Sequence, residues 1–144
     1  MESANDPFDL NRFITAQAPV YGQVVGELRD GRKRSHWMWF VFPQLLGLGG
    51  SSMAVRYGIA SLPEARAYLR HDLLGSRLRE CTRLVNQVQD RSITQIFGSP
   101  DDLKLRSSMT LFTLAADDHQ DFVDLLDKYY GGEQDPLTLA RVQR

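Results

Sequence analysis

The sequence has few of the features that mark secreted, membrane-bound or nucleic-acid-binding proteins. It contains one cysteine in 144 residues, Cys81, so no disulfide can form within the chain, as is typical of proteins kept in a reducing compartment. No apolar run approaches the roughly 20 residues that a membrane span needs, and the first residues are too polar for a secretory signal. The net charge of -1 gives no general attraction to nucleic acid or to membranes. We therefore expect a cytoplasmic protein that binds neither duplex nucleic acid nor membrane.

Motifs for common cofactors are also missing. The sequence has no phosphate loop with its Gly-Lys-Ser/Thr pattern and no dinucleotide fingerprint. The three histidines, His36, His71 and His119, are far apart and lack the spacing of paired metal ligands. Cys81 falls on a stripe of apolar residues, which argues against a nucleophilic thiol. The sequence therefore predicts neither a metal nor a cofactor.

Apolar residues recur at helical spacing along most of the chain, and the alternating pattern of β-strands is absent. A length of 144 residues fits one domain. We predict an all-α fold, a single compact domain over residues 1–144 with roughly six to eight helices, several of them short. The clearest buried stripe, in a helix expected from about residue 72, consists of Leu74, Leu78, Cys81, Val85 and Val88.

Capping residues and helix breakers set the expected boundaries. Asp6-Pro7 predicts a helix start, and Asp30-Gly31 predicts the end of the second helix. Ser35 is a candidate cap for a short helix over residues 36–42, for which a strand is the alternative. Ser99-Pro100 predicts the start of a long helix that reaches about Ala116. Further helices are expected at 53–57, from 62, at 93–97, at 120–130 and after 135.

The segment 31–50 combines charged and aromatic residues more densely than any other part of the chain. Lys33 and Arg34 supply positive charge just before a predicted helix start, where phosphate or carboxylate groups are attracted. The imidazole of His36 can serve as an acid or a base. The alternative is that the cations lie in a solvated turn and that the histidine caps a helix end.

The aromatic residues of the same segment have two interpretations. Trp37 and Trp39 offer flat faces for a base, a sugar or a cation, and Gln44 can hydrogen-bond an amide or a base edge. Buried aromatics far outnumber aromatic binding platforms, so Trp39 and its phenylalanine neighbours can equally be part of the core. Both interpretations stay open at this point.

The helix expected from about residue 101 carries hydroxyl groups inside an otherwise apolar pattern. Lys104 and Ser108 lie one turn apart on one face, and Ser107 lies beside them. The hydroxyls can bond to the preceding turn of a closely packed helix, or they can line a polar pocket wall with Lys104. The second interpretation places a pocket between this helix and the short aromatic helix.

Three motifs of this sequence resemble those of a known family. Residues 31–45, Gly-Arg-Lys-Arg-Ser-His-Trp-Met-Trp-Phe-Val-Phe-Pro-Gln-Leu, followed by residues 47–49 and 54–59, are similar to its leading signature. Residues 102–112 are similar to the second motif, and Tyr129-Tyr130-Gly131 with Asp135 to the last. The family is DUF1810, a group of bacterial and fungal proteins of unknown function, and its small mycobacterial members are especially similar. The resemblance covers about residues 6–140 and implies a mostly helical domain with no assigned activity.

The residues favour a binding site for a small ligand that is anionic and aromatic, such as a nucleotide or an ADP-ribose derivative, in an enzyme or a sensor. A pattern analogy to small helical N-glycosidases suggests a hydrolase of such compounds. The alternative is a non-enzymatic protein–protein interaction module whose aromatic loop docks a partner or a second copy. The sequence does not decide between them and gives no oligomeric state. The expected catalytic residues are His36 and Lys104, and the expected ligand-binding residues are Lys33, Arg34, Trp37, Trp39, Gln44, Ser107 and Ser108.

Overall fold

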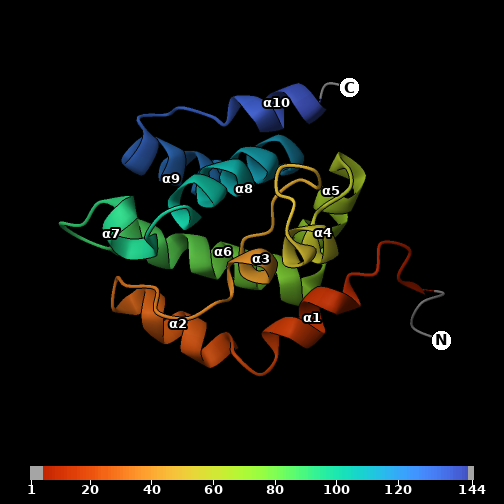
Figure 1. Cartoon of the computed structure of the whole chain (residues 1–144), viewed down its shortest axis with the longest axis horizontal. Helices are drawn as coiled ribbons and strands as arrows, with labels where there is room; N and C mark the ends of the chain where they lie inside the picture. The colour runs from red at the N-terminus through yellow and green to blue at the C-terminus, as the bar shows by residue number, and fades with distance from the viewer. Residues whose placement is uncertain (1–4, 143–144) are drawn as a thin grey trace.

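The longest helix, α6 (Asp72–Gln87), lies at the centre of the fold (Figure 1). In this computed structural model, which describes residues 5–142, α2 (Tyr21–Arg29), α5 (Leu62–Arg70) and α9 (Gln120–Tyr130) pack against it. The predicted stripe faces these helices, because its first four members, Leu74, Leu78, Cys81 and Val85, are at most 1% exposed. The helical spacing of apolar residues thus correctly predicted this helix and its buried face, although the fifth member, Val88, follows the end of the helix and is half-buried.

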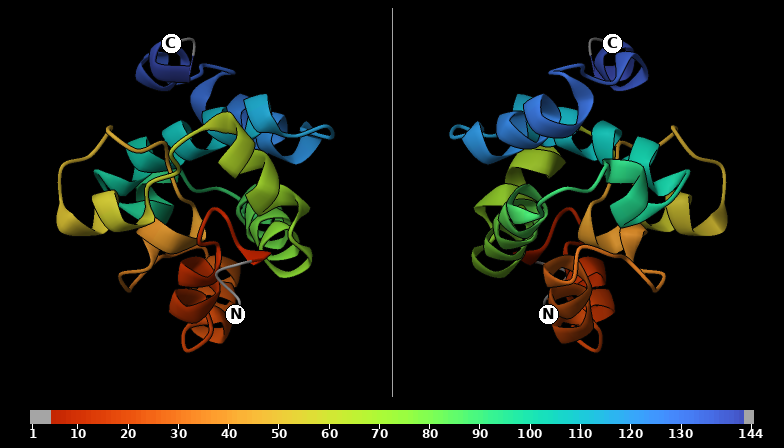
Figure 2. Two further views of the ribbon diagram at one scale, coloured as in Figure 1. Left: turned by 90° about the vertical axis from the view of Figure 1, so that its right-hand side faces the viewer. Right: turned by 90° about the vertical axis from the view of Figure 1, so that its left-hand side faces the viewer.

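A second long helix, α8 (Asp101–Ala115), packs on α5 and α9. The short α7 (Ile93–Phe97) contacts α8, and α10 (Pro136–Val142) packs on the outer side of α8. In the side views α10 lies at one end of the molecule and the first two helices at the other (Figure 2). Phe112 of α8 contacts both α5 and α9, since its ring centroid is 5.4 Å from that of Tyr68 and 6.0 Å from that of Phe122.

Three further helices of four to seven residues complete the fold. These are α1 (Asn11–Gln17), α3 (Met38–Val41) and α4 (Ser52–Tyr57), with α3 in contact with both of the others. The chain after α3 pairs with the chain after α4, because Ile59 donates its amide to the carbonyl of Gln44 at 3.0 Å. This isolated parallel bridge fixes the backbone of Gln44 next to α4. No β-strand occurs within residues 5–142.

The prediction of an all-α fold is confirmed for the described part of the chain, but the predicted number of helices is too low. Ten helices occur within residues 5–142, against the six to eight expected. Three of them are short, with four, six and five residues in α3, α4 and α7. None of the helices described is long and apolar enough to pass through a membrane.

The predicted helix over residues 36–42 is wrong at its start. Helix α3 begins at Met38, so His36 and Trp37 precede it rather than share its faces. Ser35 does not cap it, because the Ser35 hydroxyl donates to the Glu27 carboxylate at 2.5 Å instead. A hydrogen bond to a residue eight positions earlier, in another helix, is invisible to a local capping rule.

The first helix also begins later than Asp6-Pro7 suggested, at Asn11. The carboxylate of Asp6 still meets its first turn, since it accepts hydrogen bonds from the amides of Leu10 and Asn11 at 2.7 and 2.9 Å. Asp6 was therefore correctly predicted to bind the free amides at the helix start, but the helix begins further along the chain than predicted.

Candidate functional site

The turn before α3 is held by the buried carboxylate of Glu27. It accepts hydrogen bonds from the amides of Arg34 and Ser35 at 2.8 and 3.1 Å and from the Trp37 indole at 3.0 Å. Burial alone raises the pKa of Glu27, but these bonds and that of the Ser35 hydroxyl outweigh it and lower the pKa to about 2. Trp37 is consequently fixed in the core, with 1% of its surface exposed.

Lys33 is a second anchor of this turn. Its ammonium lies 2.9 Å from the carboxylate of Asp101, at the start of α8, and donates to the carbonyl of Ser35 at 2.6 Å. The same nitrogen is 5.0 Å from the centroid of the Trp37 ring, and only 6% of the Lys33 side chain is exposed. The charge of Lys33 is thus already neutralised inside the protein.

Arg34 and His36 lie on the outer side of the turn. The Arg34 guanidinium pairs with Asp30 at 3.1 Å, and 54% of its side chain is exposed. His36 is exposed and lines none of the cavities described below. The structure therefore does not bring His36 together with Lys104.

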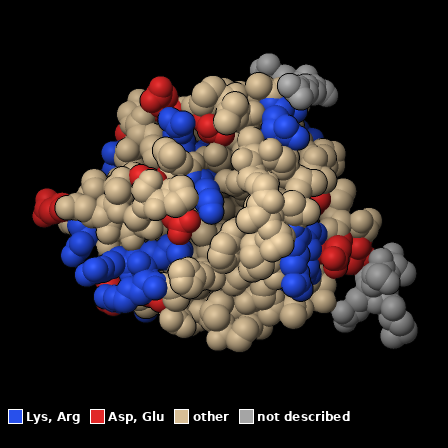
Figure 3. Space-filling view, viewed as in Figure 1, with Lys and Arg blue, Asp and Glu red and all other residues tan. Residues whose placement is uncertain are grey.

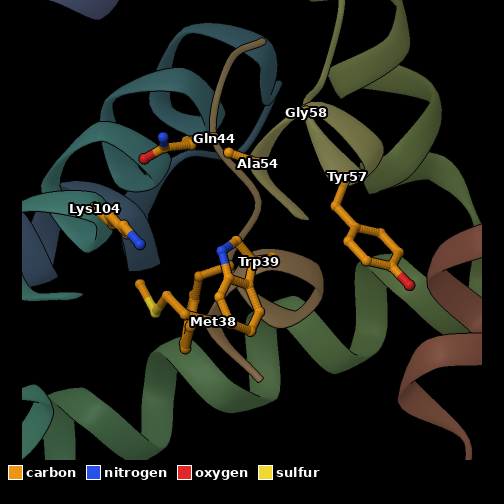
Figure 4. Close-up of a pocket in the computed structure, with 8 residues that line it drawn as sticks. Met38, Trp39, Gln44, Ala54, Tyr57, Gly58 and Lys104 are labelled. Atoms are coloured by element: carbon orange, nitrogen blue, oxygen red, sulfur yellow. The ribbon is translucent and has the colours of Figure 1, made fainter. Parts of the chain in front are cut away.

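A hollow lies between α3, α4 and α8, and we call it the α3–α8 hollow (Figure 4). It is small, with a cavity volume of about 20 Å³, which is room for a single water-sized group, and it is mostly apolar, with one charged side chain in its lining. The space-filling view shows this face of the molecule hollowed near its centre, with a basic side chain at the edge (Figure 3). The lining consists of Met38, Trp39, Phe42, Gln44, Ala54, Tyr57, Gly58 and Lys104.

Lys104 and Trp39 face each other across the hollow. The Lys104 ammonium is 5.7 Å from the centroid of a Trp39 ring, and 32% of the lysine side chain is exposed. Its nearest carboxylate oxygen, from Asp101, is 3.8 Å away, which is longer than a hydrogen bond. The Trp39 indole nitrogen is buried and has no hydrogen-bond partner within the described part of the chain. An unpaired buried donor typically costs about 1–3 kcal/mol, so this N–H is available to an acceptor that enters the hollow.

Gln44 and Gly58 form the side of the hollow near α4. In Figure 4 the Gln44 amide points toward α8, on the same side as Lys104, whereas the Tyr57 hydroxyl points away from the hollow. A Cβ added to Gly58 would lie 2.7 Å from a Leu46 methyl carbon and 2.9 Å from the Ala54 carbonyl. Glycine is therefore required there for the two backbone segments to approach, and this approach positions Gln44.

The two predicted serines of α8 occupy different surroundings. The Ser107 hydroxyl donates to the Asp135 carboxylate at 2.9 Å, and that carboxylate also accepts from the Thr138 amide at 3.1 Å. Ser107 thereby joins α8 to the first turn of α10. Ser108 is fully buried, does not line the hollow, and its hydroxyl has no hydrogen-bond partner within residues 5–142.

Of the nine predicted site residues, the structure brings Trp39, Gln44 and Lys104 together in one hollow. Sequence reasoning did not include the five other lining residues. Ala54 and Gly58 come from a segment whose contact with Gln44 depends on a bridge between distant residues. The glycine that ends α4 was the one local signal that could have pointed to them. The lining contains no histidine and no carboxylate, and no group of three or more metal-binding side chains occurs within residues 5–142.

Comparison with known proteins gives two matches. The model of the family described as "Protein of unknown function (DUF1810)" matches residues 7–142. The crystal structure of the conserved hypothetical protein Rv1873 from Mycobacterium tuberculosis is similar, with 71% sequence identity and a TM-score of 0.96. That similarity covers 96% of this chain and 99% of the other. No curated protein matches the chain significantly.

Proposed function

The chain belongs to the DUF1810 family, and we propose that it binds a small anionic ligand with a planar ring, of the nucleotide or ADP-ribose class, at the opening of the α3–α8 hollow. One observation carries the proposal. The ammonium of Lys104 and the buried, unpaired indole N–H of Trp39 face the same apolar space.

The lining suits two different parts of such a ligand. Met38, Phe42 and Ala54 supply apolar walls, which favour a flat ring over a hydrated group. Lys104 supplies a positive charge at the border of this apolar space, where a phosphate or carboxylate would be stabilised. The Trp39 N–H and the Gln44 amide add donors that can orient the ring or the anion.

The composition of the lining supports binding better than hydrolysis. A hydrolase of this ligand class needs a general base or a nucleophile within reach of the ligand. The hollow contains neither a histidine nor a carboxylate, and His36 lies outside it. The proposal is therefore a binding protein, and turnover of a bound ligand is an additional outcome to be measured.

A thermal-shift screen against nucleotides, sugar phosphates and amino acids tests the proposal. We expect a nucleotide to raise the melting temperature of the wild type, since a ligand at 100 times its Kd adds about 2.7 kcal/mol of stability. Lys104→Gln should weaken binding roughly ten- to hundredfold, because a charge-assisted hydrogen bond contributes about 1.5–3 kcal/mol.

Arg34→Gln is the matched control, since it removes one exposed positive charge outside the hollow. His36→Ala serves the same purpose for the histidine. Both variants should match the wild type in every titration. If no compound stabilises the wild type, or if Lys104→Gln binds as the wild type does, the proposal is wrong and a protein–protein interaction role takes its place.

A further inference from the structure

A second cavity continues from the α3–α8 hollow toward α10. It has a cavity volume of about 320 Å³ and lies between α8, α10 and the loop at residues 48–49, and we call it the α8–α10 groove. Gln44 and Lys104 line both cavities. The Lys104 ammonium therefore belongs to the junction of two spaces rather than to the end of one.

Three leucines lie among polar and charged residues in the walls of the groove. Leu103 and Leu137 line it with 55% and 65% of their surfaces exposed, and Leu48 lies with them. Isolated exposed leucines are ordinary, but these leucines line one cavity. Their arrangement offers an apolar group a place to lie out of water.

Arg106 adds a second cationic group to the groove. Its guanidinium lies 3.7 Å from Asp135 and 3.9 Å from Glu133, and both distances exceed that of a hydrogen bond. Its Nε is buried and has no hydrogen-bond partner within the described residues. Arg106, one of the residues that line the groove, thus carries an unpaired donor on the same helix as Lys104.

We propose that the ligand is a phosphodiester or a pyrophosphate diester, with its charge between two organic groups. This inference rests on the proposed function. One planar ring would lie at the opening of the α3–α8 hollow, the phosphate would lie at Lys104, and the second group would lie between Leu103 and Leu137. A nucleoside monophosphate with a terminal phosphate would leave the α8–α10 groove empty.

Isothermal titration calorimetry with two probes tests this arrangement. Thymidine 5′-monophosphate carries a terminal phosphate, and its p-nitrophenyl ester carries the same nucleotide with a second ring beyond the phosphorus. The monoester has the higher negative charge, so charge alone would favour it at Lys104. We expect the diester to bind about tenfold more tightly or better, through apolar contact with the leucines.

The double variant Leu103→Ser/Leu137→Ser should reduce the ratio of the two affinities to about twofold or less. Leu114→Ser, an exposed leucine on the same helix outside both cavities, should leave the ratio at the wild-type value. Circular dichroism melting checks that each variant is folded. As a second measurement, amide resonances of Leu103 and Leu137 should shift with the diester and not with the monoester.

Equal affinity for the two probes, or a ratio that the double variant leaves unchanged, would overturn the inference and leave the proposed function intact. Binding of neither probe, together with no stabilisation by any compound in the thermal-shift screen, would instead remove the proposed function itself.

Discussion

Glu27 is the residue on which the turn before α3 depends most directly, because its carboxylate accepts from two amides, a hydroxyl and an indole. A folded-state pKa of about 2 against an ordinary value of 4.5 means that the native protein binds this proton less readily than the unfolded chain does. The resulting stability is therefore complete above pH 4.5 and is lost as the pH falls toward 2.

Glu27→Gln tests this pH dependence. A shift of this size corresponds to at most about 3.5 kcal/mol, since one pKa unit is about 1.4 kcal/mol. We expect urea unfolding at pH 7 to show the variant about 2–3 kcal/mol less stable than the wild type, with the difference shrinking between pH 4.5 and 2. Glu133→Gln, at a carboxylate with 77% exposure, should change stability by less than about 0.5 kcal/mol. A Glu27→Gln deficit that stays constant with pH would contradict this account.

Urea unfolding should also give different losses of stability for substitutions at the two tryptophans. Trp37 is buried and donates its N–H to Glu27, so Trp37→Phe removes a charge-assisted hydrogen bond from the core. We expect it to cost about 2 kcal/mol of unfolding free energy. Trp39→Phe removes an N–H that is already unpaired, so its loss should stay below about 1 kcal/mol. Equal losses for the two variants would mean that the indole N–H of Trp39 is paired in solution.

At the scale of elements, one arginine attaches α1 to α4, to Gly58 just after α4, and to α5. Arg12 donates to the carbonyls of Arg56 and Gly58 at 2.9 and 3.1 Å and to the Glu64 carboxylate at 2.8 Å. The side chains of Arg12 and Glu64 are 14% and 6% exposed. Since Gly58 lines the α3–α8 hollow, this contact also supports the hollow from behind.

Arg12→Lys should destabilise the protein by about 2–4 kcal/mol. A lysine ammonium cannot reproduce the fork of the guanidinium, and Glu64 would remain buried without its full set of donors. Arg34→Lys is the matched control, because that arginine makes a single exposed ion pair and should cost less than about 1 kcal/mol. The comparison needs chemical denaturation of both variants at one pH, and similar losses would disprove the special role of Arg12.

Local patterns predicted most elements because most boundaries here have local causes. Ser51 accepts a hydrogen bond from the Ala54 amide at the start of α4, as a serine cap should. Gly31 and Gly131 end their helices with φ of 70° and 62°, where glycine is favoured. The predicted start of α3 was wrong because Ser35 and Trp37, just before the helix, donate hydrogen bonds to Glu27 of the preceding helix.

The candidate site could be predicted only in part for the same reason. Trp39, Gln44 and Lys104 were found from residue type, since a cation, an indole and an amide are informative wherever they lie. Whether a cation is free depends on its surroundings, and Lys33 is neutralised by Asp101, 68 positions further along the chain. No local rule distinguishes Lys33 from Lys104.

At the scale of the whole molecule, the Lys33–Asp101 pair joins the first part of the chain to α8. This pair lies beside the α3–α8 hollow, because Asp101 is also 3.8 Å from Lys104. Replacing one residue of a buried ion pair leaves the other charge without a partner and destabilises the protein. Replacing both residues can leave the stability nearly unchanged. The pair therefore predicts strong coupling between distant segments.

A double-mutant cycle measures this coupling. Asp101→Asn alone should cost about 2–3 kcal/mol, because the Lys33 side chain is 6% exposed and its ammonium loses its counter-charge. The double variant Lys33→Met/Asp101→Asn should be about 1–2 kcal/mol more stable than the sum of the single losses predicts. Arg83→Met/Asp121→Asn, at a pair with 60% exposure of the arginine, is the control and should show coupling below about 0.5 kcal/mol. Additive losses at Lys33 and Asp101 would mean that α8 is held to the first part of the chain by apolar packing alone, and that Lys104 keeps its position without help from this pair.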